Sequence, residues 1–191
     1  MRRLLSFIAA LFLTAGIVGA MNDADALDLE NTLYMDLEYG RVVIEMRPDL
    51  APKHVARIKE LVRDGFYDGL TFHRVIGGFM AQGGDPDGVG TGGSGKNLPA
   101  EFSKEPFKRG TLGMARSMDP NSADSQFFIN FARTRHLDGQ YTVWGQVVEG
   151  MKFVGKLKRG EPPANPDKIL KMQVAADADN GKKAKKAKKE K

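Results

Sequence analysis

The feature that most constrains the fold is a series of short apolar segments separated by turns that contain Gly or Pro. Eight segments of four to eight residues have the alternating or continuous apolar pattern of β-strands: residues 33–38, 42–46, 70–75, 79–82, 110–115, 127–130, 141–148 and 169–174. Helical spacing is found over Val55, Ile58, Leu61 and Val62, after Pro52, and again over residues 151–157. Many short strands with two helices predict a mostly β fold, a closed antiparallel eight-stranded barrel capped by two helices.

The chain length and charge distribution predict one globular domain over residues 28–176. The 191 residues are 41% hydrophobic and 28% charged, which is typical of a protein with a packed core. Of the net charge of +5, Arg2 and Arg3 contribute two and residues 177–191 contribute four, leaving about −1 for the body. The body therefore lacks the basic surface of a specific nucleic-acid-binding protein.

The N-terminal sequence predicts export. Arg2 and Arg3 precede an apolar run over residues 4–18, and small residues at 18–20 suit a signal-peptide cleavage site. We expect a signal peptide over residues 1–20, with an alternative cleavage after residue 26, and a periplasmic location. An uncleaved inner-membrane anchor is the alternative, because the run approaches the ~18 residues that span a bilayer.

The C-terminal residues 177–191 contain seven Lys and three acidic residues. Like charges repel, and nothing apolar is present to bury, so this Lys-rich tail is predicted to be disordered. It is either a solubilising tail or a segment that contacts anionic surfaces such as lipid or nucleic acid.

Residue types exclude several kinds of chemistry. The chain has no Cys, and His54, His73 and His136 are not spaced as a metal-binding pair, so we expect no metal or other cofactor. The Gly-rich residues 83–99 nearly match the sequence motifs of nucleotide-binding loops. However, Asn97-Leu98-Pro99 follows in place of the helix start that phosphate binding needs.

A polar pair within an apolar stretch is the strongest candidate site. Residues 72–85 place Arg74 and Gln82 around Phe79 and Met80. They offer hydrogen bonds and apolar surface but no nucleophile. Strand alternation would put Met80 and Gln82 on one face and Phe79 on the other. Taken alone, Arg74 could equally be a surface ion-pair partner and the apolar residues part of the core.

Three blocks, residues 72–85, 113–130 and 136–147, resemble the cyclophilin family of peptidyl-prolyl cis–trans isomerases, in its bacterial form. The resemblance extends over about residues 30–176. It implies rotamase activity on X–Pro bonds of unfolded or flexible chains and a role in the folding of exported proteins. A monomer is expected. The alternative is a proline-peptide-binding chaperone module with little turnover.

The resemblance also assigns site residues. It implies that Arg74 is catalytic and that Gln82 orients the substrate backbone. The implied substrate-binding residues are Phe79, Met80, Ala115, Arg116, Phe128, His136, Leu137 and Tyr141. Much of the family has Trp and His where this chain has His136 and Tyr141, and Gly77 stands where Pro is frequent. Because His136 replaces an indole, only weak binding of cyclosporin is expected.

Overall fold

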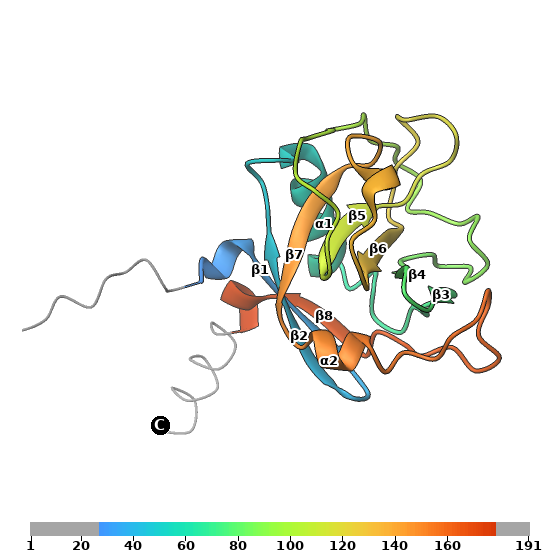
Figure 1. The fold of residues 1–191 in the computed structure, drawn as a ribbon. Coiled ribbons are helices and arrows are strands. Elements are labelled where there is room, and N and C mark those ends of the chain that lie inside the picture. The colour runs from blue at the N-terminus through green and yellow to red at the C-terminus, as the bar shows by residue number, and fades with distance from the viewer. Residues whose placement is uncertain (1–26, 179–191) are drawn as a thin grey trace, which may run out of the picture.

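The computed structural model describes residues 27–178 (Figure 1). The predicted signal peptide, both cleavage sites and residues 179–191 of the predicted tail lie outside the described residues. Residues 175–178 are helical and include the first two residues of the predicted tail. None of the helices within residues 27–178 has the length and hydrophobicity needed to cross a membrane.

The predicted eight antiparallel strands are confirmed. They are β1 (Thr32–Leu37), β2 (Gly40–Met46), β3 (Arg74–Ile76), β4 (Met80–Gly83), β5 (Thr111–Met114), β6 (Phe127–Asn130), β7 (Val143–Glu149) and β8 (Lys171–Val174). The helices are α1 (Pro52–Arg63) and α2 (Met151–Val154), with 3-10 turns η2 (Leu29–Asn31) and η3 (Arg135–Leu137). The strand order is β3-β4-β6-β5-β7-β2-β1-β8, with every pair antiparallel.

The two ends of this strand order meet, which closes the sheet on itself. Residues 70–72 were expected to belong to a strand running to Val75. They pair instead with the segment before β8: Phe72 donates to the carbonyl of Asp167 at 2.9 Å, and Ile169 donates to the carbonyl of Leu70 at 2.9 Å. The bridge between Thr71 and Lys168 lies between them. β3 is therefore shorter than predicted, because the residues before it pair with the segment before β8 and so close the barrel.

The barrel interior is a continuous apolar core. Trp144, Tyr67 and Phe127 are fully buried, and the Phe127 ring meets the other two edge-to-face at centroid distances of 5.9 and 5.7 Å. α1 covers the sheet with its predicted apolar face, which is buried at Val55, Ile58, Leu61 and Val62. Edge-to-face packing of large rings adds to the stabilisation that their burial provides.

A distant carboxylate caps α1. Ala51, at the N-cap position, has no side-chain acceptor, and Pro52 begins the helix. Glu101 accepts hydrogen bonds from the backbone N–H groups of Lys53 at 3.1 Å and His54 at 3.0 Å. Burial lowers the pKa of His54 despite the opposing effect of Glu101. The neutral ring then donates from Nδ1 to that carboxylate at 2.6 Å. The free N–H groups at the start of α1 thus find their acceptor in Glu101, which lies in the loop after the Gly-rich segment.

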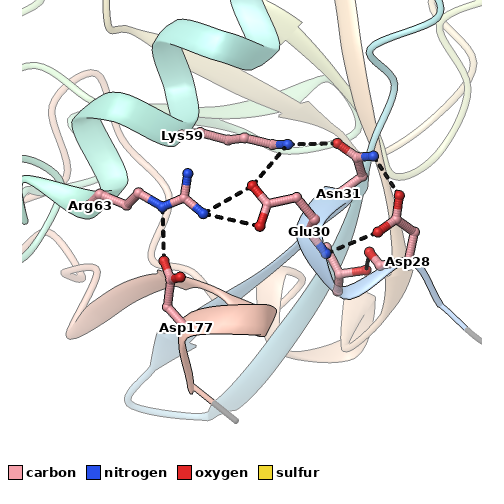
Figure 2. A network of polar contacts seen from close by, with 7 residues as sticks. Asp28, Glu30, Asn31, Lys59, Arg63 and Asp177 are labelled. Atoms are coloured by element: carbon pink, nitrogen blue, oxygen red, sulfur yellow. Dashed lines mark hydrogen bonds and ion pairs between the residues drawn. The ribbon is translucent and has the colours of Figure 1, made fainter. Parts of the chain in front are cut away.

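Both ends of the described chain are fixed beside the last turn of α1 (Figure 2). The Nη2 of Arg63 donates to both carboxylate oxygens of Glu30, at 2.9 and 3.1 Å, and its Nε donates to Asp177 at 3.0 Å. Lys59 adds a bond to Asn31 at 2.8 Å. The two ends lie next to β1 and β8, on the opposite side of the molecule from β3 and β4 (Figure 1).

Candidate active site

The register of β3 and β4 places Arg74 directly opposite Gln82. Directly opposite residues in an antiparallel pair share one face of the sheet. The Nη1 of Arg74 lies 3.5 Å from the Oε1 of Gln82, and the side chain of Arg74 is 40% exposed. Arg74 and Gln82, the polar pair that the sequence predicts, therefore lie side by side at the surface.

The predicted pocket residues come together around this pair. A cavity of about 120 Å³ is lined by Arg74, Phe79, Met80, Gln82, Ala115, Arg116, Phe128, Leu137 and Tyr141. Of the predicted site residues, only His136 is outside this lining. Its exposed ring lies 5.8 Å from the ring of Phe79, at the rim. Three segments far apart in the sequence thus form one hollow.

The floor of the cavity is a second apolar cluster, separate from the main core. It consists of Met80, Phe107, Phe128, Leu137 and Val143. The ring of Phe128 stacks on Phe107 at 5.6 Å and meets Tyr141 edge-to-face at 5.7 Å. Phe107 and Val143 support the wall from behind. Their roles could not be predicted from the sequence, because nothing distinguishes them from other core residues.

Ideal strand alternation, which would turn Phe79 away from Met80 and Gln82, does not describe the structure. Phe79 lies in the turn before β4, where its N–H donates to the carbonyl of Ile76 at 3.1 Å, and not within the strand. Strand alternation does not apply to a turn residue. The Phe79 ring therefore lines the same cavity, with the guanidinium carbon of Arg74 6.0 Å from its centroid.

A larger hollow of about 420 Å³ continues from the pocket and shares Gln82, Ala115 and Arg116 with it. Its far side is the Gly-rich loop. Gln126 joins this loop to the pocket, because it accepts a bond from Gln82 at 2.9 Å and donates to the carbonyl of Gly92 at 2.8 Å. The pocket and the hollow form one groove.

Two carboxylates shape the Gly-rich wall. Asp85, 1% exposed, accepts bonds from the N–H groups of Asp87 at 2.8 Å, Val89 at 3.1 Å and Gly90. Burial by itself raises the pKa of Asp85, but these N–H groups together with that of Gly92 outweigh burial and lower the pKa.

The other end of the loop is held by Asp124. It accepts bonds from the Ser94 hydroxyl and from the N–H groups of Gly95 at 2.8 Å and Lys96 at 3.2 Å. A Cβ on Gly93 would lie 2.5 Å from this carboxylate, so a larger residue there would displace the Asp124 side chain. For Asp85, the sequence signal that could have revealed this arrangement is a carboxylate next to a run of glycines, Gly83-Gly84-Asp85. Asp124 is far from the glycines along the chain and carries no such signal.

The side chain of Arg116 is structural. Its guanidinium donates to the carbonyls of Gln140 at 2.9 Å and Ser117 at 2.8 Å, and it lies over the Tyr141 ring at 4.5 Å. Within the described residues, the backbone N–H and C=O of Arg116 make no bond to another backbone group. This leaves the main chain of Arg116 available at the groove for the substrate-binding role that the family resemblance implies.

Two further groups border the site. His73 is buried, and neither ring nitrogen has a hydrogen-bond partner within residues 27–178. Burial lowers the pKa of His73, and Arg74 lowers it further against the effect of Asp85. Glu161, which could not be predicted as a site residue from the sequence, pairs with Arg74: its Oε2 accepts from Nε at 2.7 Å.

No group of three or more His, Asp or Glu side chains in the described part of the chain is arranged to hold a metal ion.

The closed eight-stranded barrel and this groove define a protein of the cyclophilin class. The family model described as "Cyclophilin type peptidyl-prolyl cis-trans isomerase/CLD" matches residues 32–174. The chain belongs to this family, and it is a peptidyl-prolyl cis–trans isomerase.

Relatives and solved structures agree. A protein of Brucella suis named "Probable peptidyl-prolyl cis-trans isomerase" is 54% identical over 189 residues, covering 90% of this chain and 96% of its own length. Peptidyl-prolyl cis-trans isomerase B of Bacillus subtilis is 43% identical over 133 residues, covering 68% and 92%. The cyclophilin AquaCyp293 of Hirschia baltica has a TM-score of 0.73 at 31% identity, covering 79% and 76%. A Cryptosporidium parvum cyclophilin, solved in the presence of the dipeptide Ala-Pro, has a TM-score of 0.69 at 28% identity, covering 75% and 98%.

Proposed function

We propose that Arg74 accelerates X–Pro isomerisation by stabilising the twisted amide while the apolar pocket holds the proline ring. The observation that carries the proposal is that a permanently charged donor lines the same small cavity as the apolar side chains of Phe79, Met80, Phe128 and Leu137. Gln82, opposite Arg74 in the sheet, is suited to hydrogen-bond the substrate backbone and so to hold it across the groove.

The physical basis is differential binding. Amide resonance creates a rotation barrier of ~18–20 kcal/mol. As the bond twists, the proline nitrogen regains its lone pair and can accept a hydrogen bond that the planar amide cannot. A guanidinium aimed at that nitrogen therefore binds the transition state more strongly than the ground state. No bond is broken, so the reaction requires neither a nucleophile nor a group that titrates near neutrality.

The proposed substrates are proline-containing segments of unfolded or flexible chains, and the proposed role is to assist the folding of exported proteins. The Ala-Pro dipeptide used with the Cryptosporidium parvum relative supports the first part. The basic and apolar N-terminal sequence supports the second. N-terminal sequencing of the protein from its native cells tests export. A periplasmic chain beginning near residue 21 or 27 agrees with it, and a cytoplasmic chain that keeps Met1 contradicts it.

A protease-coupled X–Pro isomerisation assay of Arg74→Ala tests the mechanism. We expect kcat/KM to fall about 10²–10³-fold, as for the loss of one transition-state donor elsewhere. Arg41→Ala is the matched control, because Arg41 is 41% exposed, has the same kind of ion pair, with Asp36 at 2.7 Å, and lies on β2 outside the groove. An Arg74→Ala protein as active as the Arg41→Ala control would rule out the proposed role of Arg74.

A further inference from the structure

The ion pair between Arg74 and Glu161 is part of a cross-strand row that includes the groove. Val75 and Gly160 form an antiparallel bridge, with N–H to carbonyl distances of 2.8 and 3.0 Å in the two directions. In antiparallel pairing, the next positions outward are also opposite each other, which places Glu161 directly across from Arg74. Gln82 lies on the other side of Arg74. The order across the surface is thus Gln82, Arg74, Glu161.

The loop that carries Glu161 is itself anchored. Asp167, whose side chain is 3% exposed, accepts bonds from the backbone N–H of Lys158 at 2.7 Å and from the hydroxyl of Tyr39 at 3.2 Å. The guanidinium of Arg159 lies over the Phe131 ring at 4.4 Å. Gly160 has a φ of +149°, and a Cβ there would lie 2.5 Å from the Cα of Pro163. The position of Glu161 is therefore imposed by the fold.

This contact determines which way the guanidinium faces. An arginine side chain has five N–H donors in one plane. Glu161 occupies Nε at 2.7 Å, on the side away from Gln82, while Nη1 lies 3.5 Å from Gln82, on the pocket side. Fixing Nε fixes the plane, because the donors of a guanidinium form a rigid fork. Without this contact, a 40% exposed arginine would sample several rotamers.

We propose that Glu161 is a positioning residue for the isomerase reaction, which holds the Arg74 guanidinium so that its terminal nitrogens face the proline pocket. The inference rests on the proposed role of Arg74. The carboxylate has two opposing effects: it orders the guanidinium, which speeds the reaction, and it partly neutralises the charge, which slows the reaction. An exposed pair has a weak Coulomb term, so ordering is the larger effect.

The variants Glu161→Ala and Glu161→Gln separate these two effects, since Gln keeps an acceptor oxygen without the charge. We expect Glu161→Ala to lower kcat about three- to tenfold with KM nearly unchanged, and Glu161→Gln to stay within about twofold of wild type. Asp36→Ala is the matched control, because it removes the carboxylate of the Arg41 pair outside the groove and should leave kcat unchanged.

Two further measurements exclude a merely structural effect. In an Arg74→Ala background, Glu161→Ala should cause no additional loss of activity, because Glu161 acts through Arg74. In ¹⁵N NMR spectra, the Nε–H signal of Arg74 should shift and exchange faster with water in Glu161→Ala, and should stay near its wild-type position in Glu161→Gln.

Four results would overturn the inference: a wild-type kcat for Glu161→Ala, a loss confined to KM, a Glu161→Gln protein as slow as Glu161→Ala, or an equal loss in the Arg74→Ala background. These results overturn the inference alone when the Arg74→Ala protein has the expected low activity. An Arg74→Ala protein with wild-type activity overturns the proposed function, and this inference with it.

Discussion

The two walls of the groove are built by opposite means. The pocket wall consists of large side chains that pack on each other, with Phe128 between the rings of Phe107 and Tyr141. The Gly-rich wall is mostly backbone, and it is held by the buried carboxylate of Asp85 and the half-buried carboxylate of Asp124. One wall offers apolar surface that can bind a ring, and the other offers a shaped main chain that can lie alongside a peptide.

The difference shows which physical property the proposed function of each wall requires. Holding a proline ring requires dry, close-packed surface, which only side chains contributed by several strands can provide. Admitting a peptide requires close approach of two backbones, which large side chains would prevent, so glycines and carboxylate–N–H bonds take their place. The two walls should therefore respond differently to substitution.

The largest effect is expected on the pocket wall. Phe128→Ala removes a ring that is 5% exposed and central to the second apolar cluster. The stability cost should approach the ~3–5 kcal/mol typical of buried Phe→Ala changes. We expect kcat/KM to fall about 100-fold or more, because 1.4 kcal/mol of lost transition-state binding is about tenfold in rate. Thermal unfolding and the isomerase assay measure the two effects.

Phe128→Leu is the conservative variant for this test, because it keeps most of the apolar volume. It should fold like the wild-type protein and lose less activity than Phe128→Ala. A folded Phe128→Ala protein with normal kcat/KM would show that the pocket wall does not hold the substrate.

A smaller effect on activity is expected at the Gly-rich wall. Asp85→Asn keeps the shape of the side chain but turns an amide N–H₂ toward N–H groups that need an acceptor. Leaving buried donors unsatisfied costs about 1–3 kcal/mol. Denaturant unfolding should show this loss, whereas kcat/KM should fall less than about tenfold, because Asp85 does not line the pocket. A loss of activity as large as that of Phe128→Ala would remove the distinction between the two walls.

Acid should weaken the same wall. The pKa of Asp85 is lowered in the folded protein, where its N–H partners outweigh burial. The unfolded chain therefore binds a proton more readily, so the stabilisation is present above the unfolded pKa of about 3.9 and is lost as pH falls through the lower folded pKa. The stability difference between wild type and Asp85→Asn should thus shrink below about pH 4. A difference that stays constant from pH 7 to pH 3 would contradict this assignment.

The smallest effect is expected at the rim of the pocket wall. His136 is exposed, and its ring lies 5.8 Å from Phe79. His136→Trp adds apolar area and an indole N–H there, so cyclosporin should inhibit the variant several-fold more strongly, at about 0.5–1.5 kcal/mol for an added aromatic contact. Inhibition titrations of the two proteins decide this. Equal inhibition would mean that residue 136 does not contribute to cyclosporin binding.

Much of the fold could be predicted because strand pattern and turn residues are local signals. All eight strands were found, with the 127–130 segment matching β6 from end to end. The strand predicted to begin at residue 70 was the main exception, since residues 69–72 bond to a segment almost a hundred residues later. This pairing depends on how the whole sheet curls, and a local sequence pattern does not predict that curvature.

What the sequence alone determined was the set of side chains at the site: Arg74 and Gln82 among large apolar residues, with later motifs that supply Phe128 and Leu137. The tertiary structure decided how they act together. It placed Phe79 in a turn facing the pocket, committed the guanidinium of Arg116 to backbone carbonyls, and set Glu161 across from Arg74. The physical reason is that the sequence fixes which side chain stands at each position. The direction in which a side chain points, and the groups it bonds to, are set only when segments distant in the sequence pair with each other.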